Sequence, residues 1–223
     1  MSLTEIRNAA TVVLVREGAD GPEVLMGQRG AGAAFMPSKF VFPGGAVDTG
    51  DAQIPLAAPI AAQSAARLAS GVAPELAHAL CVAAIREVWE ETGLPFGTPG
   101  AWQGAVPPDW QSFAAAGLLP TAASLRYVFR AITPPGRSRR FDARFFLADA
   151  GAITGDVGDM SRASDELSHL QWIALDRARH FDLPFITEIV LAEIAALLRK
   201  VGEPPSVPFF DNSGDVPTFR RIA

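Results

Sequence analysis

Apolar and polar residues follow two different periods along the chain, and each period predicts one kind of element. Six stretches are rich in β-branched or aromatic residues and end at Gly, Pro or acidic residues, a pattern typical of β-strands. These stretches are 9–16, 23–29, 40–42, 125–133, 140–148 and 169–175. Because turn-forming residues fill 17–22, we expect the first two strands to form a hairpin with a six-residue loop.

Three other stretches carry apolar residues at helical spacing. The first runs from near Ile60 to near Gly71. In the second, Pro74 suits the first turn and Gly93 suits the residue after the last turn. The third covers 185–201. The second helix also carries apolar residues at every fourth position, which predicts one buried stripe. These positions are Leu76, Leu80, Ala84 and Val88.

The remaining segments are irregular by composition. Residues 95–122 hold several Pro, Trp and Gly residues, so we expect a loop with a short helix near 110–116. Residues 151–166 predict a flexible polar loop, and the Pro-rich tail, 203–223, is expected to be extended. Because strands and helices do not alternate regularly, the sequence favours an α+β fold with a mixed sheet over a doubly wound fold. We expect residues 1–223 to form a single domain.

Composition and charge narrow the classes of function. The 223 residues carry 19 Lys and Arg against 24 Asp and Glu, and the net charge of −5 argues against binding nucleic acid through its phosphates. The single cysteine, Cys81, cannot form a disulfide within the chain. The first residues lack the pattern of a signal peptide, and no apolar run reaches the length of about 18 residues that a membrane span requires. We therefore expect a cytoplasmic protein with neither a membrane nor a nucleic-acid partner.

The candidate chemistry lies at the end of the second predicted helix. Glu87, Glu90 and Glu91 stand three and four positions apart, so their carboxylates share one helix face. Like charges at this spacing repel, and negative charge near a helix C-terminus is unfavourable. Divalent cations among the oxygens would remove both penalties, which points to Mg²⁺ or Mn²⁺. A solvated acidic face is the alternative interpretation. Arg86 can pair with Glu90 or steady Glu87.

The residues around these acids resemble a known motif. The sequence REVWEETGL, residues 86–94, matches the second half of the Nudix box, GX5EX7REUXEEXGU, and the Pro-Gly-Gly turn at 43–45 matches its beginning. Asp51 stands where the family has Glu. The chain then has 34 residues, 52–85, where the motif has seven, so the box is interrupted by an insertion of 27 residues at about 52–78.

An interrupted box resembles a subgroup of Nudix hydrolases that includes the peroxisomal coenzyme A diphosphatases. The Phe-Met-Pro sequence at 35–37 and the Arg-Arg-Phe-Asp sequence at 139–142 resemble that subgroup as well. The resemblance implies a Nudix α/β/α sandwich with a mixed sheet and a catalytic loop–helix–loop. It also implies Mg²⁺- or Mn²⁺-dependent hydrolysis of a diphosphate linkage in a small nucleoside diphosphate derivative, with coenzyme A or an acyl-CoA as candidate substrates.

The resemblance also assigns roles to single residues. The implied metal ligands are Glu87, Glu90, Glu91, the Gly45 carbonyl and Asp51. The implied catalytic residues are Glu87 as a ligand or base, Arg86 as the group that orients a glutamate, and Glu166 as a base or ligand. The candidate substrate contacts are Arg29, Arg139, Arg140 and Asp142. Arginine suits this role because its guanidinium forks onto phosphate oxygens.

Other functions stay open beside coenzyme A hydrolysis. One is a Nudix domain that senses a nucleotide without cleaving it, and another is a hydrolase of ADP-ribose or dinucleotide-type substrates. A prenyl diphosphate isomerase would need a Cys and a Glu in one site, but helix geometry turns Cys81 away from the glutamates. The Pro-rich segment 203–219 is long enough to reach across a partner, which makes a homodimer one expectation.

Overall fold

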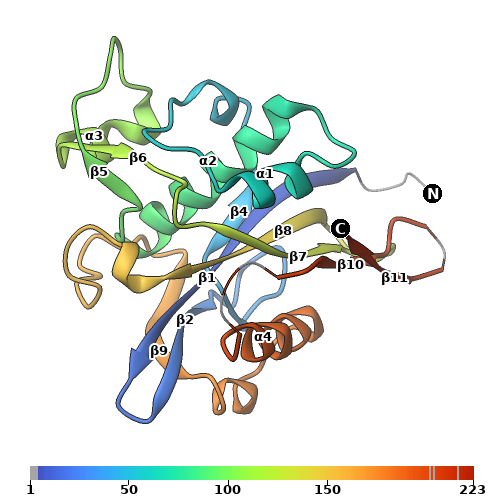
Figure 1. Ribbon diagram of the computed structural model, residues 1–223. Coiled ribbons are helices and arrows are strands. Elements are labelled where there is room, and N and C mark those ends of the chain that lie inside the picture. The colour runs from blue at the N-terminus through green and yellow to red at the C-terminus, as the bar shows by residue number, and fades with distance from the viewer. Residues whose placement is uncertain (1–4, 201, 203, 215) are drawn as a thin grey trace.

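The computed structural model describes residues 5–200, 202, 204–214 and 216–223, and within them it shows a mixed nine-stranded sheet between two layers of helices (Figure 1). The strands of the sheet are β1 (Ile6–Gly18), β2 (Gly21–Arg29), β3 (Phe40–Val41), β4 (Gly44–Ala46), β7 (Arg126–Ile132), β8 (Arg140–Asp149), β9 (Leu167–Ala174), β10 (Val207–Asp211) and β11 (Thr218–Ile222). The helices are α1 (Ala62–Leu68), α2 (Pro74–Thr92), α3 (Gln111–Ala115) and α4 (Phe185–Leu197). A small separate sheet pairs β5 (Gly97–Pro99) with β6 (Leu118–Pro120).

The strand order is β11-β10-β7-β8-β1-β2-β3, with β4 added to β1 and β9 to β2. The central strand β1 pairs in parallel with β8 and antiparallel with β2. Its side chains alternate between two cores, because successive strand residues point to opposite faces. Val12 and Leu14 pack in the core that contains α2, whereas Val13 and Val15 pack in the core that contains α4. This architecture confirms the expected α+β sandwich.

The expected β1–β2 hairpin is present, but the prediction of a six-residue loop between its strands is wrong. The strands continue until Gly18 pairs with Gly21, which leaves a two-residue turn. The hairpin is held by the backbone ladder, in which polar residues pair as well as apolar ones. Arg16 also donates to Glu23 across the strands at 2.7 Å. The predicted loop is too long because residues that are typical of turns, at 17–18 and 21–22, lie within the paired strands.

Helix α2 begins and ends as the sequence predicts. Pro74 occupies its first position, and Gly93 follows its last turn with φ of 76°, a left-handed conformation that glycine adopts without strain. The prediction of a single buried stripe underestimates how much of the helix is buried, because every residue from 79 to 89 is buried. Strand β1 covers one side of the helix, while the Trp110 and Phe113 region covers another. Cys81 lies in this core, where burial raises the pKa of its thiol to about 12.

Two irregular segments contain more structure than expected. The short helix near 110–116 is confirmed as α3, but the flanking residues also form the β5–β6 pair. The tail is extended, as expected, but it also joins the sheet: β10 pairs in parallel with β7, and β11 forms an antiparallel hairpin with β10. The chain's own sheet thus holds the tail, and the expectation of a homodimer loses the reason given for it. Among the described residues, no helix combines the length and hydropathy of a bilayer crossing.

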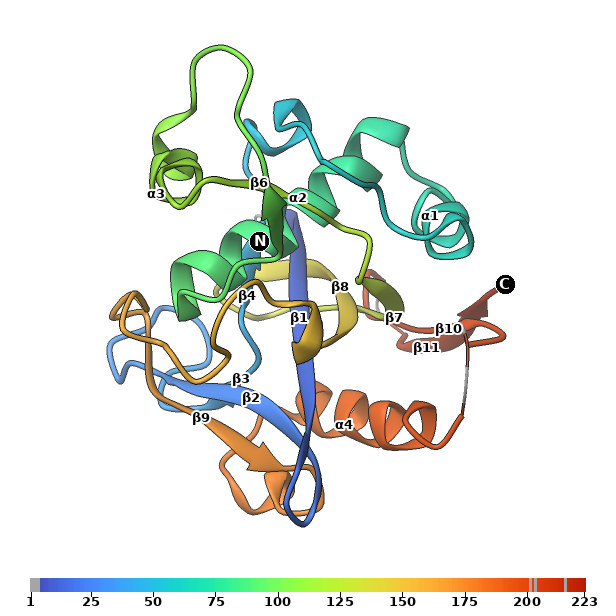
Figure 2. The ribbon, with the colours of Figure 1, turned by 60° about the vertical axis from the view of Figure 1, so that its left-hand side comes forward.

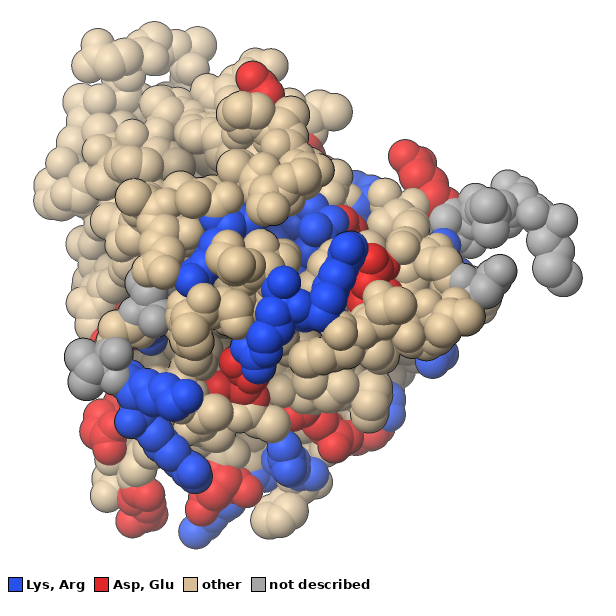
Figure 3. All heavy atoms as spheres, turned by 45° about the vertical axis from the view of Figure 1, so that its right-hand side comes forward, with Lys and Arg blue, Asp and Glu red and all other residues tan. Residues whose placement is uncertain are grey.

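The 27-residue insertion lies on the α2 side of the sheet; it begins within η1 (Asp51–Gln53) and then contains α1. Helix α1 packs on β7, where the Tyr127 backbone N–H donates to Ser64 Oγ at 3.0 Å. Figure 3 shows that the upper part of the molecule, which holds the insertion and the 95–122 segment, carries few charged side chains on the face in view. Lys and Arg side chains gather below it, toward the C-terminal hairpin.

Candidate functional site

Four charged side chains from the end of α2 form the centre of the candidate site. Arg86, Glu87 and Glu91 are buried, and Glu90 is half-buried. Their spacing on the helix brings them together, as the sequence predicts. The solvated acidic face is therefore not what this helix presents, because two of the three carboxylates are withdrawn from water.

Arg86 binds acids from two different segments. Its Nε and Nη2 donate to the two carboxylate oxygens of Asp51, at 3.0 and 3.1 Å. Its Nη1 donates to Glu87 at 2.9 Å and to Glu90 at 3.2 Å. Nη2 also donates to the Ala46 carbonyl at 3.0 Å, so one guanidinium fastens the loop after β4 to the acidic turn. Both oxygens of Asp51 are engaged by this arginine, which leaves that side chain less free than Glu91 to bind a cation.

Glu91 has a different environment. It is 1% exposed, and its Oε2 accepts a hydrogen bond from the Gly44 backbone N–H at 2.8 Å. Its Oε1 is also buried and has no hydrogen-bond partner within the described part of the chain. A buried carboxylate oxygen without a partner is costly, and such an atom is a reason to look for a missing ligand.

Burial raises the pKa of all three glutamates. It raises that of Glu87 to about 7, even though the Arg86 guanidinium favours the charged form. The pKa of Glu91 is well above its ordinary value because of burial and the neighbouring Glu87. The pKa of Glu90 is raised for the same main reason, burial. The site therefore holds acidic groups whose ionised forms need a cation for full stabilisation.

The oxygen ligands of this site suit a divalent cation, but the carboxylates do not converge on one point. Across residues 5–200, 202, 204–214 and 216–223, no three His, Cys, Asp or Glu side chains form a ready metal-binding group. Arg86 bridges Glu87 and Glu90 instead. The unpartnered Glu91 Oε1 and the surrounding carboxylates are nevertheless the hard oxygen ligands that Mg²⁺ and Mn²⁺ prefer.

The Pro-Gly-Gly turn brings backbone against these acids. A Cβ atom on Gly45 would lie 2.3 Å from Glu87 Oε1, closer than any side chain permits. Gly45 thus allows the backbone to pass directly beside the carboxylate. Together with the bond from Gly44 to Glu91, this close approach fixes β4 at the acidic end of α2.

We predict that Gly45→Ala lowers kcat on the order of a hundredfold while the protein stays folded, because the new methyl group displaces the Glu87 carboxylate. Gly50→Ala is the matched control in the following loop, where a Cβ meets nothing within 4 Å. Steady-state rates and thermal melting of both variants test the prediction. Equal rates for Gly45→Ala and Gly50→Ala would show that the close approach is irrelevant to activity.

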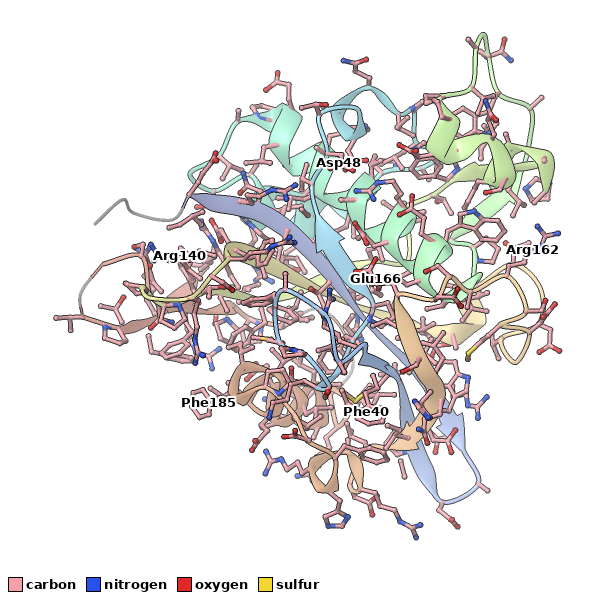
Figure 4. The ribbon with its side chains drawn as sticks, turned by 180° about the vertical axis from the view of Figure 1, so that it is seen from behind. Phe40, Asp48, Arg140, Arg162, Glu166 and Phe185 are labelled. Carbon is pink, nitrogen blue, oxygen red and sulfur yellow. The ribbon has the colours of Figure 1, made fainter. Side chains whose placement is uncertain are left out.

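Glu166 and Arg29 meet near this centre from neighbouring strands. Arg29 ends β2 and Glu166 precedes β9, and their side chains form an ion pair of 3.1 Å. Figure 4 shows Glu166 between the start of β9 and the acidic end of α2. Glu166 is close enough to Glu87 to raise the pKa of that carboxyl slightly. The two sequence candidates thus lie beside the α2 acids.

A cavity of about 1140 Å³ opens from this polar group across the α4 side of the sheet. Gly44, Gly45, Glu87, Glu166 and Arg29 line one part of it. Its other walls are mainly apolar and come from loop 30–39, strand β8, the start of α4 and strand β10. Their aromatic side chains are Phe35, Phe141, Phe145, Phe185 and Phe210.

Arg139 also lines the cavity, but two other candidate substrate contacts do not. The Arg140 side chain is 4% exposed and donates to the carbonyls of Thr133 and Asn212, at 3.0 and 2.9 Å. Asp142 is buried in ion pairs with Arg130 and Arg144, at 2.7 and 3.1 Å. The structure thus gives these two residues architectural contacts and leaves Arg29 and Arg139 at the cavity.

Several residues at the site have no signal in the sequence pattern. Asp48 faces Arg86 at 3.5 Å, from the loop after β4 (Figure 4). Phe185 is 68% exposed at the start of α4, and Phe210 comes from the tail. These side chains meet only because distant segments fold onto one sheet, although the apolar run at 207–210 could have indicated a further strand.

Comparison with known proteins gives one relative by sequence and several by structure. No protein-family model matches the chain. A curated Caenorhabditis elegans protein named as a nudix hydrolase is 30% identical over 179 residues, which cover 75% of this chain and 51% of that protein. The chain therefore spans about half the length of the curated relative it matches.

Two solved structures show the same fold. A NUDIX hydrolase from Alicyclobacillus acidocaldarius has a TM-score of 0.65 and 28% identity, over 91% of this chain and 99% of that one. The NUDIX domain of NrtR from Shewanella oneidensis, solved with ADP ribose, has a TM-score of 0.50 and 12% identity, over 87% of this chain and 90% of that one. At this identity the similarity concerns the fold alone. With the box residues assembled as described, these similarities support assignment of the chain to the Nudix hydrolase family.

Proposed function

We propose that this protein is a metal-dependent hydrolase that cleaves the diphosphate linkage of a nucleoside diphosphate derivative. The observation that carries the proposal is the buried acidic end of α2, where Glu91 Oε1 is unpartnered and the pKa of Glu87 is raised to about 7. This group lies at one end of a large cavity that also contains Glu166 and Arg29. Acids, an arginine and an adjoining cavity are what diphosphate hydrolysis requires.

Each residue of the centre has a proposed role. Glu87, Glu90, Glu91 and the Gly45 carbonyl would hold Mg²⁺ or Mn²⁺. A bound divalent cation would neutralise charge on phosphate oxygens and favour ionisation of an attacking water. Arg86 orients Glu87 and Glu90 through its hydrogen bonds. Asp51, proposed as a ligand from the motif, supports the site first by holding Arg86.

Two carboxylates are candidates for the base that takes the proton from water. The pKa of Glu87, raised to about 7, is near the pH at which a base works best. Glu166 is more exposed and is paired with Arg29. Substrate phosphates that recruit Arg29 would release Glu166 from that ion pair, so both residues stay in the proposal.

The cavity favours a substrate with a sizeable group attached to the diphosphate. Its apolar walls extend well beyond the acidic centre, and Phe35 packs edge-on against Phe141 with ring centroids 5.2 Å apart. Arg139 adds a positive charge within the same cavity. Coenzyme A and acyl-CoA combine a nucleoside diphosphate with a long arm, and we propose them as the substrates. This choice agrees with the interrupted box and the sequence at 35–37.

A panel of substrates with Mg²⁺ tests the proposal. The panel contains coenzyme A, an acyl-CoA, ADP-ribose and a dinucleotide, and release of a nucleoside monophosphate is followed by chromatography. We expect cleavage that stops when EDTA is added. If no compound is cleaved while wild type and Glu90→Gln bind one of them equally well, the protein is not a hydrolase of this class.

Binding without cleavage is the second candidate function. The observation in its favour is that Arg86 bridges Glu87 and Glu90 and no three acids are gathered for a cation in the described residues. A nucleotide-binding protein of this kind would take ADP-ribose, the compound found with the NrtR domain. Calorimetric binding of ADP-ribose with no turnover over long incubation would favour this second function.

A further inference from the structure

The insertion that interrupts the box carries a buried arginine. Arg67 lies in the last turn of α1 and is 5% exposed. Its Nη1 donates to the Pro204 carbonyl at 2.6 Å, and its Nη2 donates to the Pro205 carbonyl at 2.9 Å. A planar guanidinium that grips two successive carbonyls fixes both the position and the direction of the backbone. Arg67 therefore fastens the segment that leads into the C-terminal hairpin.

This hairpin forms part of the substrate cavity. Shortly after Pro205 the chain enters β10, which pairs in parallel with β7. Phe210 from β10 and Asn212 just beyond it both line the cavity. Helix α1 lies above β10 and β11 in two different views (Figure 1 and Figure 2). The insertion and the cavity wall are thus joined by a few residues of chain.

A second buried arginine holds the other end of β10. Arg140 donates to the Asn212 carbonyl at 2.9 Å, while Asn212 Nδ2 donates to the Ile132 carbonyl at 3.0 Å. Between the two arginines, the β10–β7 ladder is short, with Phe209 paired to Arg130 and Phe210 to Ala131. Because this ladder alone offers few bonds, the end contacts decide how firmly the strand is placed.

The insertion is itself anchored, so it can act as a fixed support. Ala57 N–H donates to the Pro120 carbonyl at 2.8 Å, and Ala122 N–H donates to the Ala58 carbonyl at 2.9 Å. With the bond from Tyr127 to Ser64, these contacts tie the insertion to the body of the sandwich. A movement of α1 would therefore break bonds at several places, whereas a loss of the Arg67 guanidinium removes only its two bonds to the C-terminal segment.

We propose that the insertion fixes the position of the far wall of the substrate cavity, by which we mean the wall formed by Phe210 and Asn212. Arg67 is the positioning residue through which the insertion acts on this wall. This inference rests on the proposed function for its substrate. Phe210 and Asn212 would contact the group attached to the diphosphate, at a distance from the α2 acids. Arg67 then governs affinity for substrates with a long arm and has little influence on the hydrolytic step.

Arg67→Met tests this role, since methionine keeps the apolar stem and removes the donors. We expect its KM for coenzyme A, which has a long arm, to rise about tenfold while kcat changes less than about twofold. The KM for ADP-ribose, which has a short arm, should stay unchanged. Arg67→Lys keeps the charge and a single donor nitrogen in place of the two that bind the carbonyls, and it should restore part of the affinity. The matched control is Arg126→Met, which removes an exposed bond of 3.2 Å to the Gly202 carbonyl of the same segment and should change neither KM.

Two further measurements separate positioning from general stability. Phe210→Ala should reproduce the selective rise in KM, and adding it to Arg67→Met should raise KM no further, because both changes act on one wall. Hydrogen exchange should accelerate at the amides of residues 207 and 209–211 in Arg67→Met and stay unchanged in α2. Equal changes for both substrates, or exchange that is unaltered in β10 or faster throughout the protein, would overturn the inference. If wild type cleaves neither compound, the proposed function fails by itself, while exchange and binding constants still test the wall.

Discussion

Glu91→Gln is expected to lower kcat/KM by about a thousandfold while it leaves the protein as stable as wild type or more stable. The carboxylate is 1% exposed, and its Oε1 has no partner in the described residues. Its charge is therefore unfavourable for folding, and the nearby Glu87 adds repulsion. An amide removes that charge and retains an oxygen that can accept the bond from Gly44. Activity and stability should consequently change in opposite directions.

Rates with Mg²⁺ and urea unfolding of the same preparations measure the two effects. Glu75→Gln is the control, because Glu75 is an exposed acid in the first turn of α2 and lies far from the site along the helix. It should alter neither quantity. If Glu91→Gln retained its activity, Glu91 would have no role in catalysis. If it lost activity and stability together, the carboxylate would be a structural group.

The second large effect is a loss of stability with rising pH in the metal-free protein. Glu87 has an ordinary pKa of 4.5, which the fold raises to about 7. Between these two values the folded protein holds a proton that the unfolded chain has released, so the free energy of unfolding falls as pH increases. This one group accounts for about 3 kcal/mol over that window. Glu90 and Glu91 act in the same direction, since burial raises the pKa of both.

Urea midpoints at several values between about pH 5 and about pH 7 measure this loss in the presence of EDTA. Glu87→Gln should flatten the dependence, because the amide does not titrate. Mg²⁺ should restore stability most strongly at the upper end of the range, where the carboxylates are ionised. A stability that rose with pH in EDTA, or that was unchanged by Glu87→Gln, would contradict the account of these acids.

The acidic end of α2 could be predicted from the sequence because it depends on local rules. Spacing alone places the three glutamates and Arg86 on neighbouring helix positions, and Pro74 and Gly93 mark the ends of the helix. The burial that raises the pKa of these acids could not be predicted. It depends on β4, which contacts the helix through Gly44 and Gly45, and these glycines lie far away in the sequence.

Arg140 and Asp142 show how strand alternation decides the fate of a side chain. In β8, Phe141 and Phe145 face the cavity. Neither Arg140 nor Asp142 shares that face, because successive strand residues point in opposite directions. Both are buried, Asp142 in an ion pair with Arg144 and Arg140 on the carbonyls of Thr133 and Asn212. A charged residue near an expected phosphate site suggested substrate contact. The period of the strand assigns Arg140 and Asp142 to the opposite side of the sheet.

The C-terminal hairpin was not predicted because the prolines of the tail indicated an extended segment outside the sheet. Pro208 lies inside β10, where the neighbouring Phe209 and Phe210 make the pairs with β7. Proline lacks an N–H and is tolerated where that donor is not needed. The apolar run at 207–210 is the signal for a strand, and its place in the sheet depends on contacts from Arg67 and Arg140 that lie far away in the sequence.

The binding of Mn²⁺, followed by electron paramagnetic resonance, tests most directly whether the acidic end of α2 is a divalent-metal centre. Mn²⁺ is titrated into metal-free wild type, Glu91→Gln and the Glu75→Gln control without substrate, so the result does not depend on knowing the reaction. We predict saturable binding to wild type and to Glu75→Gln, competition by Mg²⁺, and binding at least about tenfold weaker in Glu91→Gln. Equal binding by wild type and Glu91→Gln, or no saturable binding by wild type, would contradict the assignment of this centre.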